Sequence, residues 1–465
     1  MWRRSNGRLL ALLGVFALIL GWAYMRAGIT TIRSARSISA TMPMSNSEAF
    51  VDPTHETAVR NEWTQWRGGE GNGVASTAQP PITWGPGKNI RWAVDLPGRG
   101  HSSPIVWNGR CFLQTSTEKE QTQCLLAYDL KTGRQLWMTE LHRGPLPVIH
   151  QKNTHASATP ACDGTSVYTC CIHQGELWVS SVSSTGQIEW QIAAGPYSSE
   201  WGFGSSPVYW RGRLFVLADQ RGAGLDRMLG VSYLAAIDCR SAQILWRIKR
   251  PSGVSYGTPC FLDHPQDPQL IVGGPGWLIS YSPENGEERW RCPWSGGRTA
   301  STPVADLQSV FCSTSQPGAK FISVPVDRSG LLTTKEIRWE IERSAPDVPS
   351  CVIYRDRLYA VQDKGILSCL DLMTGKPFWV KRLSGSVTAS PVAAAGNIYV
   401  FNEQGRCFVV AAKDEFELVQ ENETDASILA TPAVTGRCLL VRTTEQLLCL
   451  EQSAEKVDAA TAERD

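Results

Sequence analysis

Short apolar runs rich in strand-forming residues, separated by polar turns, recur along the chain with almost no helical periodicity. Each group of runs opens with two small residues and a proline, a signature that returns about every 45 residues. The signatures are Ser102-Ser103-Pro104, Ala158-Thr159-Pro160, Ser205-Ser206-Pro207, Gly257-Thr258-Pro259, Ser301-Thr302-Pro303, Ala389-Ser390-Pro391, Ala430-Thr431-Pro432 and the degenerate Pro349-Ser350-Cys351. Each group closes with a turn and a tryptophan, except near Leu418. The closing residues are Trp92, Trp137, Trp190, Trp246, Trp290, Trp339 and Trp379.

This repeat predicts an all-β fold, an eight-bladed β-propeller with four-stranded blades. The segment Asn89 to Leu96 contains a Trp strand with no strands before it, and the last unit, Thr431 to Leu450, lacks its Trp strand. We therefore expect the amino-terminal strand to complete the last blade, which removes an open edge. The propeller should span residues 62–451. The small signature residues should line the central channel, where packing requires small side chains.

The two ends of the chain differ from this body. Arg3, Arg4 and Arg8 precede an uncharged apolar run over residues 9–25, which predicts a signal-anchor or transmembrane segment over 1–26. Residues 27–61 should form a disordered tether and residues 452–465 a disordered tail. No cysteine precedes Cys111, so a lipoprotein lipobox is not expected. We predict a single-pass protein of the cell membrane with an extracytoplasmic, periplasmic body.

Composition narrows the function classes. A formal net charge of +1 disfavours nucleic-acid binding as the main activity. Most of the 14 cysteines fall inside apolar strand runs, where they act as small hydrophobes. A tight hairpin at Thr443-Thr444 would place Cys438 opposite Cys449, so one cross-strand disulfide is geometrically conceivable.

One motif carries a resemblance to a known family. The run from Ala127 to Trp137 has the pattern A-x-D-x-x-T-G-x-x-x-W, and two near copies end at Trp246 and Trp379. This pattern resembles the docking motif of the pyrroloquinoline-quinone-like propellers, a superfamily that includes quinone dehydrogenases and BamB-type assembly scaffolds. The resemblance implies fold rather than activity, because the motif is structural. The expected blade-docking residues are the closing tryptophans with Asp129, Thr132, Gly133, Asp238, Asp371, Thr374 and Gly375.

A quinone-dependent dehydrogenase is the main enzymatic alternative. The adjacent Cys170 and Cys171 match the vicinal disulfide that such enzymes hold against the cofactor, so they are weak candidates for cofactor binding. The simpler interpretation is that they end an apolar strand. No calcium-binding set, attached haem domain or G-x-S-x-G elbow is recognisable, so we predict no catalytic residue, no metal and no cofactor, with pyrroloquinoline quinone and calcium as the alternative.

Long loops predict a binding surface instead. In a propeller the blade-to-blade connections and the loops between second and third strands share one end face, and the long ones here, Met138 to Ser157, Gln191 to Gly204 and Asp219 to Ser232, belong to blades 1–3. Mixed aromatic and charged side chains suit a protein partner. The face should gather His142, His150, His155, His173, Trp201, Phe203, Asp219, Arg221, Asp226 and Arg227.

The leading hypothesis is therefore a non-catalytic, membrane-anchored interaction scaffold. A quinone-dependent or degenerate dehydrogenase and a small-molecule receptor at the channel mouth stay open as alternatives. The four histidines lack metal-ligand spacing, which favours solvated loop residues over a metal site.

Overall fold

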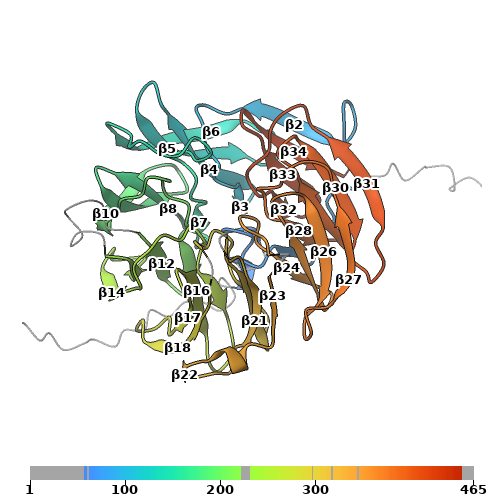
Figure 1. Cartoon of the computed structure of the whole chain (residues 1–465). Coiled ribbons are helices and arrows are strands. Elements are labelled where there is room, and N and C mark those ends of the chain that lie inside the picture. Colours follow the sequence, from blue (N-terminus) through green and yellow to red (C-terminus); the bar gives the residue numbers. More distant parts are fainter. Residues whose placement is uncertain are drawn as a thin grey trace, which may run out of the picture. The chain divides into compact units, whose positions relative to one another are not determined.

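The computed structural model describes residues 57–59, 62–220, 231–295, 297–315, 318–342 and 345–452, all within one compact unit, Val51–Asp465. Eight β-sheets surround a central axis (Figure 1), which confirms the eight-bladed propeller. The predicted signal-anchor, most of the tether and the tail from residue 453 onward lie outside the described residues. In the part of the chain that is described, no helix has the length and hydropathy needed to cross a membrane.

Each blade is an antiparallel sheet whose strands follow one another outward from the axis. The strands of blades 1 to 4 are β3 (Ile105–Trp107), β4 (Arg110–Thr117), β5 (Thr122–Asp129) and β6 (Gln135–Arg143); β7 (Ala161–Cys162), β8 (Ser166–His173), β9 (Glu176–Ser183) and β10 (Ile188–Pro196); β11 (Val208–Trp210), β12 (Arg213–Ala218), β13 (Tyr233–Asp238) and β14 (Ile244–Lys249); β15 (Cys260–Leu262), β16 (Gln269–Gly274), β17 (Trp277–Tyr281) and β18 (Glu288–Pro293).

Blades 5 to 8 follow the same plan. Their strands are β19 (Val304–Ala305), β20 (Ser309–Ser313), β21 (Phe321–Pro325) and β23 (Trp339–Ile341); β24 (Val352–Tyr354), β25 (Arg357–Val361), β26 (Ile366–Asp371) and β27 (Pro377–Arg382); β28 (Val392–Ala394), β29 (Asn397–Phe401), β30 (Arg406–Ala411) and β31 (Leu418–Glu423); β32 (Ala433–Thr435), β33 (Cys438–Arg442), β34 (Gln446–Glu451) and β2 (Ile90–Asp95).

The amino-terminal strand closes the ring as the sequence predicts. Strand β2 pairs antiparallel with β34, with Trp92 opposite Cys449. In Figure 1 this blue strand lies beside the red end of the chain. The pairing satisfies the outer edge of β34 and joins segments about 350 residues apart, so the last blade depends on both ends of the propeller.

Two short parallel strands are additions that the repeat does not predict. Strand β1 (Val74–Ala75) pairs with the inner strand β28, and β22 (Gly330–Leu331) pairs with the outer strand β18. The second lies in the long connection between β21 and β23, which also contains the 3-10 helix η1 (Thr334–Glu336).

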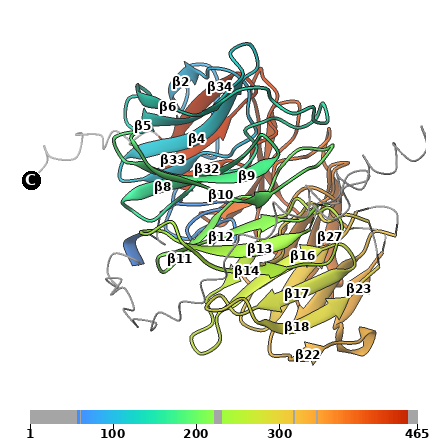
Figure 2. The ribbon, with the colours of Figure 1, turned by 90° about the vertical axis from the view of Figure 1, so that its left-hand side faces the viewer.

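Alternation along the strands joins neighbouring blades into one core. In β29, Ile398 and Val400 pack into the cluster shared with blade 6, whereas Tyr399 and Phe401 pack into the cluster shared with blade 8. Because successive strand residues point to opposite faces, each middle strand needs apolar residues at nearly every position. Blades 2 and 3, whose sheets face the viewer in Figure 2, share a cluster of this kind.

A ring of seven hydrogen bonds connects the eight signature triplets around the central axis and stays open only at Ser103, whose hydroxyl has no partner among the described residues. In each case a backbone N–H of one blade donates to the signature hydroxyl of the next blade. The bonds run from Ser103 to Thr159 (3.0 Å), Thr159 to Ser206 (2.9 Å), Ser206 to Thr258 (3.0 Å), Thr258 to Thr302 (3.1 Å), Thr302 to Ser350 (2.8 Å), Ser350 to Ser390 (2.9 Å) and Ser390 to Thr431 (3.0 Å). The signature therefore selects a hydroxyl as well as a small side chain.

Removing one hydroxyl from this ring should destabilise the propeller. Thr258→Val leaves the buried N–H of Ser206 without its acceptor, so we expect a loss of about 1–3 kcal/mol in the free energy of unfolding, measured by chemical denaturation. Thr165→Val, at an exposed site in the turn between β7 and β8, is the control and should stay within about 0.5 kcal/mol. Equal losses in the two variants would show that the ring hydroxyls serve only to fill space.

The closing tryptophans dock against the turn of the following blade. The indole N–H groups of Trp92, Trp137, Trp190, Trp339 and Trp379 donate to backbone carbonyls there, at 2.9–3.0 Å. The turn of blade 1 is closed by Asp129, which accepts bonds from the N–H and hydroxyl of Thr132 (2.8 and 2.6 Å) that lower the pKa of its carboxyl group. Asp238 with Ser241, and Asp371 with Thr374, repeat this geometry.

Trp290 departs from this pattern. Its indole is fully buried and donates to Gln269 of its own blade (3.1 Å). Residues Val326 and Leu332, from the long connection before β23, pack in the same cluster. Because this connection replaces the tight turn of blade 5, Trp290 packs beneath an insertion instead of docking on an Asp-Thr-Gly turn.

The segment 63–73 occupies the centre of the ring, where the blue chain lies in Figure 1. Its backbone carbonyls accept hydrogen bonds from inner-strand residues of blades 1, 2 and 7. Trp66 donates to Thr302 (3.2 Å), and the fully buried Arg67 donates to the carbonyl of Cys351. Burial lowers the pKa of Arg67 to about 10. This segment is thus a folded central element of the propeller.

Cys438 and Cys449 do not lie directly opposite each other, the arrangement that the sequence predicts, but diagonally across the hairpin with their thiols in contact. Cys438 lies opposite Glu451, and Cys449 lies opposite Leu440. The hydroxyl of Thr443 accepts bonds from the N–H groups of Glu445 and Gln446, and the N–H of Thr443 donates to the carbonyl of Gln446. The turn is therefore centred on Thr444-Glu445 rather than on Thr443-Thr444, which shifts the register by two. All 14 cysteines are free thiols.

Candidate functional site

The long loops of blades 1 and 2 build two cavities on the end face that carries the blade-to-blade connections. The loop over 144–160 follows β6, and the loop over 197–207 follows β10. Asn153 of the first loop donates to the carbonyl of Trp201 in the second (2.7 Å). Gly202 has a φ of +84°, and a Cβ there would lie 2.7 Å from the Asn153 amide. The two loops therefore interlock and separate a central pocket from a side pocket.

The central pocket, of about 600 Å³, lies at the centre of the propeller, where Trp66 of the segment 63–73 belongs to its lining. Six of the seven residues that supply the ring hydroxyls, all except Thr159, also line it. His150 stacks on Trp201 with ring centroids 4.2 Å apart, and the Arg298 guanidinium lies 4.8 Å from the Trp201 ring. The carboxylates of Asp347 and Asp363 also line the pocket; burial raises the pKa of both, and for Asp347 the neighbouring Asp363 adds to the rise.

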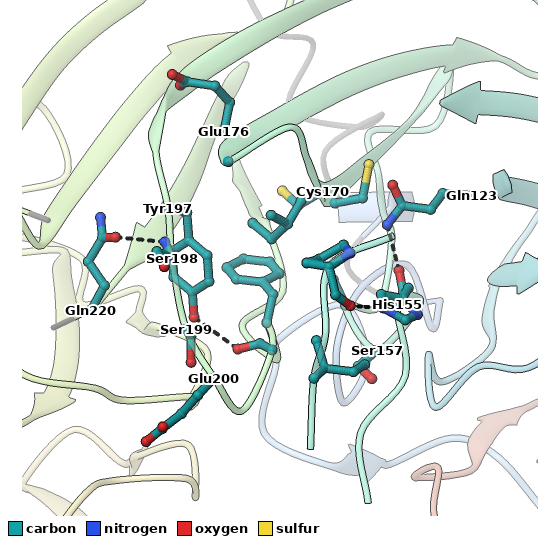
Figure 3. Close-up of a pocket in the computed structure, with 18 of the residues that line it drawn as sticks. Gln123, His155, Ser157, Cys170, Glu176, Tyr197, Ser198, Ser199, Glu200 and Gln220 are labelled. Atoms are coloured by element: carbon teal, nitrogen blue, oxygen red, sulfur yellow. Dashed lines mark hydrogen bonds between the residues drawn. The ribbon is translucent and has the colours of Figure 1, made fainter. Parts of the chain in front are cut away.

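The side pocket lies at the end of blade 2, between its two flanking loops, and has a volume of about 670 Å³ (Figure 3). Tyr197 and Phe203 meet edge to face within its lining, 5.2 Å apart, and Ile172 adds an aliphatic wall. His155 is held by a bond between its Nε2 and the carbonyl of Pro147 (2.7 Å). Ser157 lines both cavities. The lining is mainly apolar, with polar groups at its margins.

The predicted face is thus divided. His150 and Trp201 face the central pocket, whereas His155 and Phe203 face the side pocket. His173 lines neither cavity. It stacks on His142 at 4.7 Å beside Trp178, and burial, with a smaller contribution from His173, lowers the pKa of His142 to about 4. His142 is therefore an uncharged packing residue near neutral pH.

Asp219, which was predicted to belong to the partner-binding face, lies inside the propeller. Its side chain is buried and accepts two bonds from Arg250 (2.8 and 3.0 Å) and one from Ser255 (2.7 Å). It therefore does not face a partner, because the carboxylate neutralises a buried guanidinium. The predicted surface residues Arg221, Asp226 and Arg227 lie outside the described residues.

The cysteine pair does not fit the quinone site that the resemblance implies. Cys170 and Cys171 are free thiols on an unbroken ladder, opposite Val179 and Trp178. They line the side pocket rather than the central one. Burial raises the pKa of Cys171 to about 12, which keeps the thiol protonated. Within the described ranges, no three His, Cys, Asp or Glu side chains are grouped to hold a metal ion. Cys170 and Cys171 therefore lie away from the central pocket as protonated, buried thiols.

Several residues that line the two pockets were not predicted from the sequence. Val148, 93% exposed at the rim of the side pocket, and the lining residues Glu176 and Glu200 lie in loops or strand ends without a motif. Arg298 comes from a distant blade. Trp66 did carry a signal, because it is a tryptophan outside the repeat register, placed before the first blade.

Comparison with known proteins agrees with this geometry. A sequence profile of the family described as outer membrane protein assembly factor BamB matches residues 68–264 and 230–457, which is most of the chain. The chain belongs to this BamB family. The curated BamB of Shewanella oneidensis is 23% identical over 219 residues, which cover 45% of this chain and 53% of that protein. The match thus spans about half of that relative.

Solved structures show that the fold is shared by BamB proteins and by enzymes. The BamB structure from Moraxella catarrhalis has a TM-score of 0.55 at 12% identity and covers 78% of this chain and 99% of its own. The quinohemoprotein alcohol dehydrogenase of Comamonas testosteroni has a TM-score of 0.64 at 12% identity, covering 87% and 83%. At this identity the likeness establishes the fold alone.

Proposed function

We propose that this BamB-family propeller is a non-catalytic scaffold of the cell envelope that binds a protein partner on the loop face of blades 1 and 2. The observation that carries the proposal is the pair of interlocked loops, which hold an apolar pocket beside the 93% exposed side chain of Val148. An exposed aliphatic residue at the rim of a preformed apolar pocket is typical of an interaction surface.

Three further points support a scaffold. The family profile covers both halves of the propeller, and the S. oneidensis relative is named as an assembly factor. Trp201, which contacts His150 and Arg298, contributes an aromatic ring to the same face, and aromatic and arginine residues are enriched at protein interfaces. The vicinal Cys170 and Cys171 are free thiols that line the side pocket rather than the central one. We also propose that the N-terminal apolar run over 9–25 anchors this scaffold, with the propeller outside the cytoplasm.

Substitutions on the loop face should reduce partner recovery without unfolding the protein. We expect Val148→Asp to lower the amount of partner that co-purifies from crosslinked membranes by about tenfold, because it places a charge in an apolar interface. Trp201→Ala should act in the same direction. Co-purification with the tagged full chain, quantified by mass spectrometry, is the measurement.

The control for this experiment is Leu307→Asp. Leu307 is 60% exposed in the turn between β19 and β20, at the opposite ends of the inner strands from the blade connections. It should leave recovery unchanged. Equal recovery from the Val148→Asp and Leu307→Asp variants would refute the proposed face.

A further inference from the structure

We propose that the side pocket binds a protein segment in which a large apolar residue is flanked on both sides by Lys or Arg. The inference rests on the proposed scaffold function and adds the chemistry of the partner.

The interior of the pocket selects an apolar anchor. Ile149, Ile172, Tyr197 and Phe203 contribute apolar side chains to the lining, and no Lys or Arg of the described chain contributes to it. A volume of about 670 Å³ lies within the range of about 300–1,000 Å³ that is usual for ligand pockets. A phenylalanine or leucine side chain would bury its apolar surface there.

The margins of the pocket select positive charge. Glu176 and Glu200 lie at opposite ends of the cavity in Figure 3. Glu176 is half-buried and Glu200 is exposed. Neither carboxylate has an ion-pair or hydrogen-bond partner among the described residues. Two unpaired carboxylates on either side of an apolar cavity are complementary to an apolar residue between two cations.

A peptide fits this pocket better than a lipid or a small amphiphile. The Gln123 side chain, 2% exposed in the pocket wall, donates its amide to the carbonyl of His155 (2.9 Å) and so ties the wall to the loop over 144–160. The exposed Val148 also extends the apolar surface beyond the cavity, where a protein partner, but not an enclosed small molecule, would contact it.

The test measures the affinity of short peptides for the full chain in phosphatidylcholine nanodiscs by fluorescence anisotropy. A lysine–phenylalanine–lysine peptide should bind about tenfold more tightly than its glutamate–phenylalanine–glutamate and lysine–alanine–lysine counterparts. The double variant Glu176→Lys/Glu200→Lys should reverse the charge preference. Glu415→Lys, at an exposed site on blade 7, is the matched control and should leave it unchanged. Thermal midpoints establish that the variants are folded.

Equal affinity for the two charged phenylalanine peptides, or no reversal in the double variant, would overturn the proposal. Tight binding of the alanine peptide would overturn the apolar anchor. Binding of a cationic amphiphile such as dodecyltrimethylammonium, with no binding of any peptide, would make the pocket an amphiphile site. If the double variant still recovers its partner from membranes but Val148→Asp does not, the scaffold stands and this inference fails.

Discussion

Asp219→Ala is expected to lower the free energy of unfolding by about 3–5 kcal/mol, because it leaves the buried Arg250 without its counter-ion. Burial acts to lower the pKa of Arg250, but Asp219 and Tyr281 outweigh that effect and raise it, so the guanidinium stays charged at neutral pH. Arg250 also donates to the hydroxyl of Tyr281 in blade 4 (2.7 Å). The lost carboxylate would therefore weaken the junction between blades 3 and 4.

Two further variants serve as controls for Asp219→Ala. Glu421→Ala removes one partner of the exposed Arg406 pair and should cost about 0–1 kcal/mol. The double variant Asp219→Ala/Arg250→Met should recover most of the loss, since no unpaired charge remains. Chemical denaturation measures all three. A loss below about 1 kcal/mol for Asp219→Ala, combined with reduced partner recovery, would restore Asp219 to the binding surface.

Gly133→Ala is expected to destabilise the propeller by about 3 kcal/mol through the docking of blade 8 on blade 1. Gly133 has a φ of +73°, and a Cβ there would lie 2.7 Å from the ring of Trp92. The cost therefore has two parts, the strain of a left-handed backbone in a residue with a Cβ and the displacement of a tryptophan packed between blades. Gly375, with a φ of +67° and its Cβ position 2.7 Å from Trp339, should respond in the same way.

Gly109→Ala measures the cost of backbone strain alone, without displacement of a tryptophan. Gly109 has a φ of +70° but no atom within 4 Å of its Cβ position, so it should lose only the backbone contribution, about 1–2 kcal/mol. The difference between Gly133→Ala and Gly109→Ala is the cost of crowding the tryptophan. In the double variant Gly133→Ala/Trp92→Ala this crowding is absent, so the two substitutions should cost less together than the sum of their separate effects. Identical losses at Gly133 and Gly109 would contradict the docking account.

The sequence was sufficient for the features that repeat. The signature triplets and the closing tryptophans predicted eight blades and the closure by β2. The same packing recurs in every blade, so a degenerate copy can be recognised by comparison with the intact ones. Features that occur once were not predicted. The central segment 63–73 and the strand β22 have no sister segments, and their positions follow from tertiary contacts alone.

Local reasoning failed where a single side chain decided the outcome. Cys438 and Cys449 lie diagonally rather than directly opposite each other, because bonds between Thr443 and Gln446 centre the turn one residue later than predicted. The polar residue Asp219 in a long loop indicated exposure, but a partner 31 residues away buries it. The loop face itself was predicted from loop length and topology, whereas its division into two pockets depends on contacts such as Asn153 to Trp201, which sequence does not reveal.

The central claim, a protein-binding face on the loops of blades 1 and 2, is tested most directly by site-specific photocrosslinking in intact membranes. A photoreactive residue replaces Val148 in one sample and Leu307 in the other, and adducts are identified by mass spectrometry. The account predicts a discrete protein adduct from position 148 and none from position 307. No adduct from position 148, or the same adducts from both positions, would contradict it.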